Sequence, residues 1–225
     1  MNIAAIVTDI EGTTSSIAFV HEVLFPYASK MLPAFVREYA QDAHVAELLT
    51  AARAEAGEDN VDNERVIELL LQWIREDRKA TPLKALQGLI WKRGFEHKDF
   101  TGHIYEDAAR NLRVWYDNGI DLYVYSSGSV QAQQQLFGYS DAGDLRPLFK
   151  GYFDTRIGHK REASSYRAII DSIGIAAAKI LFLSDIVEEL DAARDAGMQT
   201  IQLVRDNGAP TDSHLVAHSF DEIQL

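Results

Sequence analysis

The stretch that decides the fold is IAAIVTDIEGTTSS, which runs from Ile3 to Ser16. Its first five residues, Ile3 to Val7, are apolar and predict a buried β-strand. Two carboxylates, Asp9 and Glu11, follow at once, and a glycine and four hydroxyl residues come after them. Side chains at i and i+2 of an extended segment point to the same side. Asp9 and Glu11 can therefore face one site at the end of the strand, and Gly12 permits a sharp turn away from it.

Further short apolar runs recur along the chain, with helical patterns between them. The runs are Asp121–Tyr125, Lys179–Leu183, Gln199–Val204 and a weaker one at Gly151–Asp154. Apolar residues at i, i+3 and i+4 predict helices over Tyr105–Trp115, Val130–Phe137, Glu162–Ile173 and Ile186–Ala196. This alternation of strand and helix predicts an α/β fold with a doubly wound parallel sheet, in which ligands bind at the carboxyl ends of the strands.

The segment from about Ser15 to His97 breaks this alternation, because it contains no convincing strand and is typical of four or so helices. The first of these helices is expected to be interrupted by Pro26 and Pro33. We therefore expect a helical insert over residues 15–97, placed like a lid, and a catalytic core built from residues 1–14 and 98–225.

Composition excludes several classes of protein. The chain has 225 residues, with 22 Lys and Arg against 34 Asp and Glu, so its formal net charge is 22 − 34 = −12. An acidic surface of this kind repels phosphate backbones and anionic lipids, so neither nucleic acid nor a membrane is expected as a partner. The absence of cysteine removes disulfides, thiolate nucleophiles and cysteine metal sites. With no secretory signal or membrane span expected either, a cytoplasmic location is the default prediction.

Other predicted strands also end in polar groups that a buried strand does not need. Ser126 and Ser127 follow one, Ser184 and Asp185 follow another, and Lys160 lies in the loop after the weak strand. Each has an ordinary structural explanation, such as a helix cap, an acid at a helix N-terminus or a solvated lysine. Their convergence with the first carboxylate pair on one edge of one sheet favours a functional site.

The chemistry of such a set is that of phosphoryl transfer. Aspartates without a histidine cluster are hard oxygen ligands that suit Mg²⁺ with retained waters and a phosphate oxygen. A carboxylate nucleophile would form an aspartyl phosphate, and the second carboxylate would protonate the leaving oxygen and later accept a proton from water. Lysine and serine would hold the remaining phosphoryl oxygens.

These residues also carry a family resemblance. The motifs DIEGT at Asp9–Thr13, SS at Ser126–Ser127, Lys160, and SD at Ser184–Asp185 resemble those of the haloacid dehalogenase superfamily of aspartyl phosphatases, whose cap matches the helical insert. Glu11 in place of the usual second aspartate narrows the resemblance to the enolase-phosphatase (acireductone synthase) family of methionine salvage. The resemblance to this family also rests on three longer segments: DRKATPLKALQGLIW (Asp77–Trp91), VYSSGSVQAQQQLFG (Val124–Gly138) and FDTRIGHKREASSY (Phe153–Tyr166).

The resemblance implies a bifunctional enzyme that enolises 2,3-diketo-5-methylthiopentyl 1-phosphate and then removes its phosphate to give an acireductone. It implies one Mg²⁺ per chain, no other cofactor, and a monomer. The resemblance also implies roles position by position. Asp9 would be the nucleophile and a metal ligand, Glu11 would be the general acid/base with its backbone carbonyl on the metal, and Asp185 would be the last metal ligand. Ser126 and Ser127 would bind phosphate or substrate, and Lys160 would be a catalytic residue that binds phosphate.

Two other functions stay open on the sequence: a generic Mg²⁺-dependent small-molecule phosphatase of the same superfamily, and a non-catalytic phosphometabolite-binding module. The base that takes the enolisation proton, the order of the two steps, and the cap residues that contact the substrate tail are also open. Glu189, one helical turn after Asp185, could support the metal site or be an ordinary solvated acid.

Overall fold

The computed structural model describes residues 2–205 and 208–225, which form two compact units. One unit combines Met1–Ile17 with Thr101–Leu225, and the other is Ala18–Phe100. Both boundaries fall slightly later in the chain than the expected limits of the helical insert. We describe each unit by itself and call them the core unit and the helical unit.

Within the described residues, the core unit contains one six-stranded, entirely parallel sheet in the order β3-β2-β1-β4-β5-β6. The strands are β1 (Ala5–Thr8), β2 (Asp121–Tyr125), β3 (Phe149–Phe153), β4 (Ile180–Ser184), β5 (Gln199–Leu203) and β6 (Leu215–Ala217). β2 and β3 follow one another on one side of β1, and β4, β5 and β6 follow one another on its other side. The switch point between β1 and β4 is where a doubly wound sheet binds its ligand.

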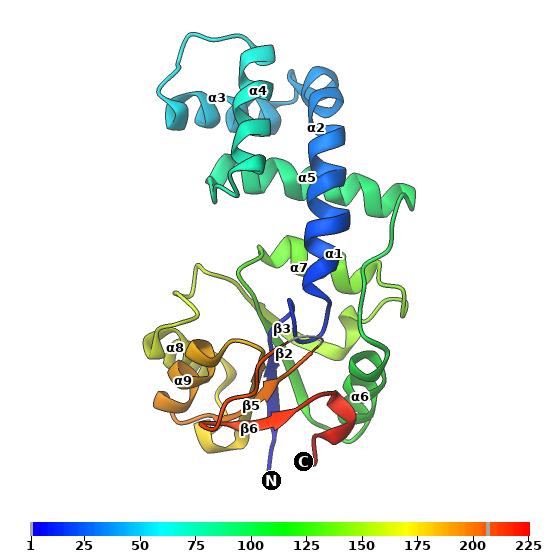
Figure 1. Ribbon diagram of the computed structural model, residues 1–225, viewed down its shortest axis with the longest axis vertical. Helices are drawn as coiled ribbons and strands as arrows, with labels where there is room; N and C mark the ends of the chain where they lie inside the picture. The colour runs from blue at the N-terminus through cyan, green and yellow to red at the C-terminus, as the bar shows by residue number, and fades with distance from the viewer. Residues whose placement is uncertain (1, 206–207) are drawn as a thin grey trace. The chain divides into compact units, whose positions relative to one another are not determined.

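Helices cover both faces of this sheet (Figure 1). They are α6 (Glu106–Asp117), α7 (Val130–Gly138), α8 (Ala163–Ile173) and α9 (Val187–Asp195), with short 3₁₀ helices η2 (Arg146–Leu148), η3 (Ala177–Lys179) and η4 (Phe220–Glu222). On one face, the fully buried residues Val7 and Phe182 pack with Ile169 of α8 and Leu190 of α9. The predicted α/β sheet is confirmed, because both faces need apolar cover and receive it.

The helical unit consists of a short α1 (Ile17–Phe19) at its boundary, a π-helical turn η1 (Val20–Leu24), and α2 (Phe25–Tyr39), α3 (Ala43–Ala56), α4 (Asn63–Arg75) and α5 (Thr81–His97). The expected interruption of its first long helix is wrong at Pro33, which lies inside α2. The buried neighbours Leu32 and Phe35 hold this helix in the apolar core of the unit, and their packing offsets the lost backbone hydrogen bond. Pro26 lies in the first turn of α2, directly after the π-helical turn η1, so the change of helix type falls beside this proline.

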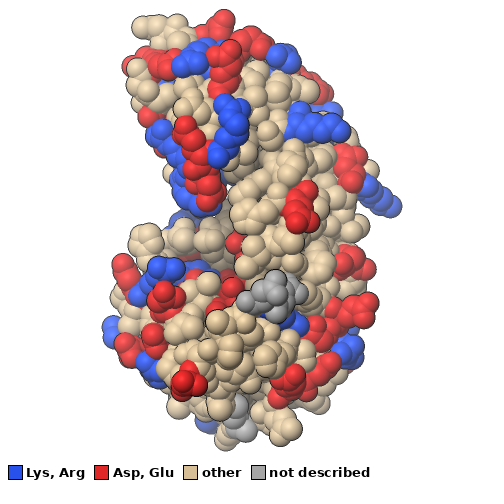
Figure 2. All heavy atoms as spheres, viewed as in Figure 1, with Lys and Arg blue, Asp and Glu red and all other residues tan. Residues whose placement is uncertain are grey.

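Figure 2 shows acidic and basic side chains interspersed on the face drawn. Among the described helices, none combines the length and the apolar character that a membrane crossing requires.

Candidate active site

The loop that follows β1 is a tight turn that places Asp9 and Glu11. The backbone amides of Thr13, Thr14 and Ser15 all donate to the carbonyl oxygen of Ile10, at 3.2, 3.0 and 2.9 Å. We call residues 10–15 the catalytic loop. The turn requires the left-handed backbone of its glycine, and this position also has no room for a side chain.

That glycine is Gly12, with φ of +72°. A Cβ added to it would collide with the carboxylate of Asp185. The sequence suggested only a sharp turn away from the strand at this point. The structure shows in addition that the loop after β1 and the loop after β4 are in direct contact, because one of them lacks a side chain.

All six candidate residues from the sequence line one cavity of about 120 Å³, together with three residues that were not among them. The lining is Asp9, Glu11, Ile17, Ser126, Ser127, Lys160, Asp185, Ile186 and Glu189. Every one of these residues belongs to the core unit. A cavity of this size is smaller than pockets that enclose a whole organic ligand, so it suits a phosphoryl group and an ion.

Lys160 lies at the centre of the charges in this cavity. Its Nζ lies 2.5 Å from Oδ1 of Asp9 and 2.6 Å from Oε2 of Glu189, and its side chain is only 10% exposed. Burial by itself lowers the pKa of Lys160, but the two carboxylates more than offset this effect, and the pKa is raised above its ordinary value. Lys160 is therefore a buried cation, and the simpler interpretation of a solvated lysine does not hold.

Two tyrosine hydroxyls hold the loop that carries Lys160. The hydroxyl of Tyr166 donates to the backbone carbonyl of Lys160 at 2.7 Å, and the hydroxyl of Tyr125 donates to the carbonyl of Gly158 at 2.9 Å. Both tyrosine side chains are fully buried in the core. The lysine backbone is thus held in place before any substrate binds.

Two further carboxylates in the cavity hold protons more tightly than usual. Burial, and then the nearby charge of Asp9, raise the pKa of Asp185 to about 7. The same two causes, in the same order, raise the pKa of Glu189 to about 7. The cavity therefore concentrates more negative charge than Lys160 alone balances.

Asp185 provides the observation that tests whether a metal ion fits. Its Oδ1 is buried and has no hydrogen-bond partner among the described residues. An unpaired buried carboxylate oxygen is costly unless a cation or a donor satisfies it. No group of three or more Asp, Glu or His side chains able to hold a metal converges in residues 2–205 and 208–225. One or two carboxylates, a backbone carbonyl, water and a phosphate oxygen nonetheless form a set that Mg²⁺ commonly accepts.

Ser126 and Ser127 occupy different positions in the cavity wall. Ser126 is buried, and its hydroxyl oxygen accepts a hydrogen bond of 3.1 Å from the backbone amide of Gly128. The helix that follows is capped by Ser129, whose hydroxyl accepts from the amide of Ala132. Ser126 is therefore not the N-cap of α7, although its hydroxyl closes the local turn at Gly128. Ser127 is exposed and lies at the mouth of the cavity.

Glu189 is the functional candidate that sequence reasoning left open. It is 8% exposed, and it accepts a hydrogen bond of 2.9 Å from the hydroxyl of Ser184 as well as pairing with Lys160. The only signal for it in the sequence was its spacing of one helical turn from Asp185, which many solvated helices share.

A sheet of this topology, with an acidic pair after β1, a serine pair after β2, a lysine after β3 and an aspartate after β4, defines a class of hydrolase. The chain belongs to the haloacid dehalogenase-like hydrolases, whose family model matches residues 3–197. Within this class it belongs to the enolase-phosphatase E1 family. It is 60% identical to an enolase-phosphatase E1 from Pseudomonas aeruginosa strain UCBPP-PA14, over 99% of both chains, and 57% identical to one from Methylococcus capsulatus, over 99% of this chain and 98% of the other.

Solved structures share the fold of this chain. The UTR4 protein from Saccharomyces cerevisiae has a TM-score of 0.84 and 35% sequence identity, over 99% of this chain and 100% of the other. CbbY from Rhodobacter sphaeroides, solved in complex with phosphate, has a TM-score of 0.63 at 15% identity, a likeness of fold alone. Both the family resemblance and the fold class inferred from the sequence are confirmed.

Proposed function

We propose that this chain is a bifunctional enolase-phosphatase of methionine salvage. It converts 2,3-diketo-5-methylthiopentyl 1-phosphate to the dihydroxy acireductone and phosphate. The observation that carries the proposal is the buried contact between Lys160 and Asp9, which places a cation against a strand-end carboxylate at the switch point of the sheet. The family membership supports the same activity.

In the phosphatase half-reaction, Asp9 is the nucleophile. One of its carboxylate oxygens attacks phosphorus and forms an aspartyl phosphate, while Glu11 donates a proton to the leaving oxygen. Glu11 then accepts a proton from the water that hydrolyses this intermediate. Lys160 and the hydroxyl of Ser126 hold phosphoryl oxygens, and Ser127 at the cavity mouth contacts the substrate beyond the phosphate.

A magnesium ion, one per chain, would be held by Asp9, by the backbone carbonyl of Glu11 and by Asp185. When bound, it supplies positive charge that neutralises the transferring phosphoryl group. Asp185 contributes the buried oxygen that otherwise lacks a partner. Glu189, which also pairs with Lys160, keeps that lysine directed into the cavity.

In the enolase half-reaction, a proton moves from the carbon beside a carbonyl group to that carbonyl oxygen. The phosphate subsite anchors the substrate for this step, because Lys160 is fixed by its backbone contact with Tyr166. We expect the helical insert, residues 15–97 by the sequence, to act as the substrate cap. A monomeric enzyme in the cytoplasm also stays our prediction from the sequence.

One assay tests the proposal directly. The diketo phosphate is incubated with the protein, with and without Mg²⁺, and the enol chromophore and free phosphate are followed in one sample. We expect the enol to form and phosphate to follow only with metal. Phosphate release from simple esters without any enol would favour a generic phosphatase, and no turnover at all would favour a phosphometabolite-binding module.

A further inference from the structure

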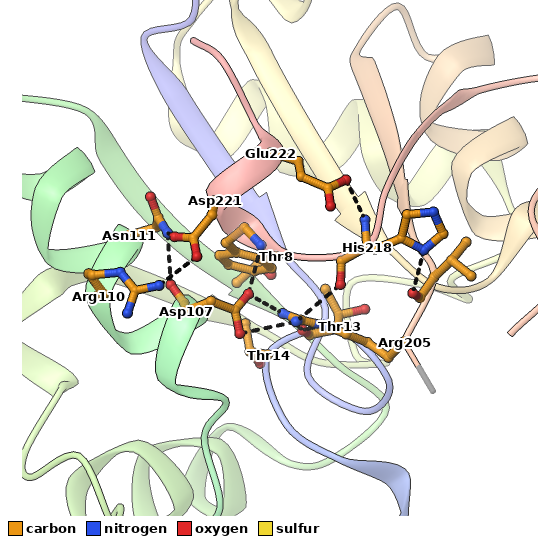
Figure 3. Close-up of polar contacts among 12 residues, drawn as sticks. Thr8, Thr13, Thr14, Asp107, Arg110, Asn111, Arg205, His218, Asp221 and Glu222 are labelled. Carbon is orange, nitrogen blue, oxygen red and sulfur yellow. Dashed lines mark hydrogen bonds and ion pairs between the residues drawn. The ribbon is translucent and has the colours of Figure 1, made fainter. Parts of the chain in front are cut away.

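Arg205 lies just after β5 and is hydrogen-bonded to the backbone of the catalytic loop. Its Nε and Nη2 donate to the backbone carbonyl oxygen of Thr13 at 3.2 and 3.1 Å. Figure 3 shows the guanidinium between this carbonyl and the carboxylate of Asp107. Neither Arg205 nor Asp107 lines the cavity.

The pair formed by Arg205 and Asp107 is buried and fully engaged. The guanidinium makes two contacts with the Asp107 carboxylate, of 3.1 and 2.9 Å, and the two side chains are 9% and 15% exposed. Oδ2 of Asp107 also accepts from the backbone amide of Phe220 at 2.7 Å. The guanidinium lies 4.2 Å from the centroid of the Tyr105 ring. Because all of these contacts hold the planar guanidinium group of Arg205, its position and orientation are fixed.

The neighbouring residue of the loop is held by the same group of residues. The carbonyl oxygen of Thr14 accepts from the backbone amide of Tyr105 at 3.0 Å, and the Thr14 hydroxyl donates to the carbonyl of Asp9 at 3.1 Å. Two successive carbonyls of the catalytic loop are therefore fixed by the start of α6 and by Arg205. The segment between them and β1 is the one that carries Glu11.

We infer that Arg205 is a positioning residue that sets the placement of Glu11 for proton transfer to the leaving group. This inference rests on the proposed function, in which Glu11 is the acid. The bidentate contact with the Thr13 carbonyl is the feature a lysine cannot reproduce, because an ammonium group is a point donor and not a planar fork. Arg205→Lys keeps a positive charge opposite Asp107 but removes the two guanidinium donors that bind the Thr13 carbonyl together.

The test compares two substrates that differ in their need for an acid. With Arg205→Lys we expect kcat/KM for the diketo phosphate to fall about tenfold, a part of the full effect of a general acid. For p-nitrophenyl phosphate, whose leaving group departs without a proton, we expect a change of less than about twofold. A merely structural defect would lower both values together, and that result, or wild-type values for both substrates, would overturn the inference.

Arg110→Gln is the matched control. It breaks an exposed ion pair of 2.6 Å with Asp221, which joins α6 and η4 as the contact of Asp107 with the Phe220 amide does, without touching the loop. We expect it to leave kcat/KM for both substrates unchanged, and an equal loss in this variant would count against a specific role for Arg205. Should Arg205→Lys fail to fold, Asp107→Asn replaces it with the same two readouts. The two failures are distinguishable: the proposed function fails if the wild-type protein releases no phosphate from the diketo phosphate, whereas the inference alone fails if the wild type is active and the variant does not show the expected difference between the two substrates.

Discussion

Oδ1 of Asp9 lies 2.5 Å from Nζ of Lys160, although 151 positions separate the two residues in the chain. The contact joins the loop after β1 to the loop after β3, across β2. Because both side chains are almost completely buried, removal of either one takes away a charged partner that solvent does not replace. Replacing either residue therefore changes the chemistry of both.

Removal of the cation tests this dependence. We expect Lys160→Ala to reduce kcat by roughly a hundredfold or more, which corresponds to about 3 kcal/mol of lost transition-state stabilisation. Steady-state phosphate release measures the effect. The control is Lys150→Ala, since Lys150 pairs with Asp121 at the exposed surface. Lys160 would lose its assigned role if the two variants turned over at the same rate.

Asp9→Asn tests the nucleophile. The amide keeps the shape of the side chain but cannot attack phosphorus, so we expect no phosphate release and no phosphorylated protein in rapid-quench samples. The enol chromophore should still form if enolisation needs only substrate binding. Circular dichroism checks that the fold is retained, and substantial residual turnover would exclude Asp9 as the nucleophile.

The metal assignment makes a prediction that does not depend on activity. Mg²⁺ that binds only the folded protein should stabilise it, by about 2.7 kcal/mol at a concentration one hundred times the dissociation constant. We expect the midpoint of thermal unfolding of the wild-type protein to rise with added Mg²⁺, and that of Asp185→Asn to stay nearly constant. An equal rise in both proteins would place the ion elsewhere.

We expect Tyr152 to contribute to the fall in the free energy of unfolding at alkaline pH. Burial raises the pKa of Tyr152 to about 12, and its hydroxyl has no hydrogen-bond partner among the described residues. Between pH 10 and pH 12 the unfolded chain loses this proton while the folded chain keeps it, so stability falls as pH rises.

Tyr152→Phe removes this contribution, which we expect to be under about 1 kcal/mol at pH 11 because the side chain is partly exposed. Urea unfolding at pH 8 and pH 11 should show a smaller loss for the variant than for the wild type. Tyr116→Phe, at an exposed position, is the control and should leave the loss unchanged. A loss in Tyr152→Phe as large as that of the wild type would contradict the assignment.

The sequence predicted the elements that carry strong periodicity and the groups that end them. Five of the six described strands were expected within a few residues, because buried parallel strands are continuous apolar runs. β6 was missed because it is only three residues long and its Leu215 is exposed, so no pattern marks it. The helix through Pro33 was missed because burial of its neighbours, which a local pattern does not report, outweighs the local cost of proline.

In the site, the sequence located the strand-end residues but not their contacts. Lys160 had only an unfavourable position before a helix to distinguish it, because its partners lie far away in the chain. Arg205 had no signal at all, since Thr13 and Asp107 are both distant in sequence from it. Contacts of this kind depend on the completed sheet and cannot be inferred from local patterns.

The order of the strands in the sheet also limits the order in which parts of the protein can fold. β1 is synthesised well before β4, yet the two strands are neighbours in the sheet, so that Ala5 waits for Ile180. The helical unit, continuous over Ala18–Phe100, can complete its own contacts much earlier. At synthesis rates of about 5–20 residues per second, the interval between these events is on the order of ten seconds. During that interval the apolar strand at the N-terminus needs protection, so the early chain is the form that we expect to depend most on chaperones.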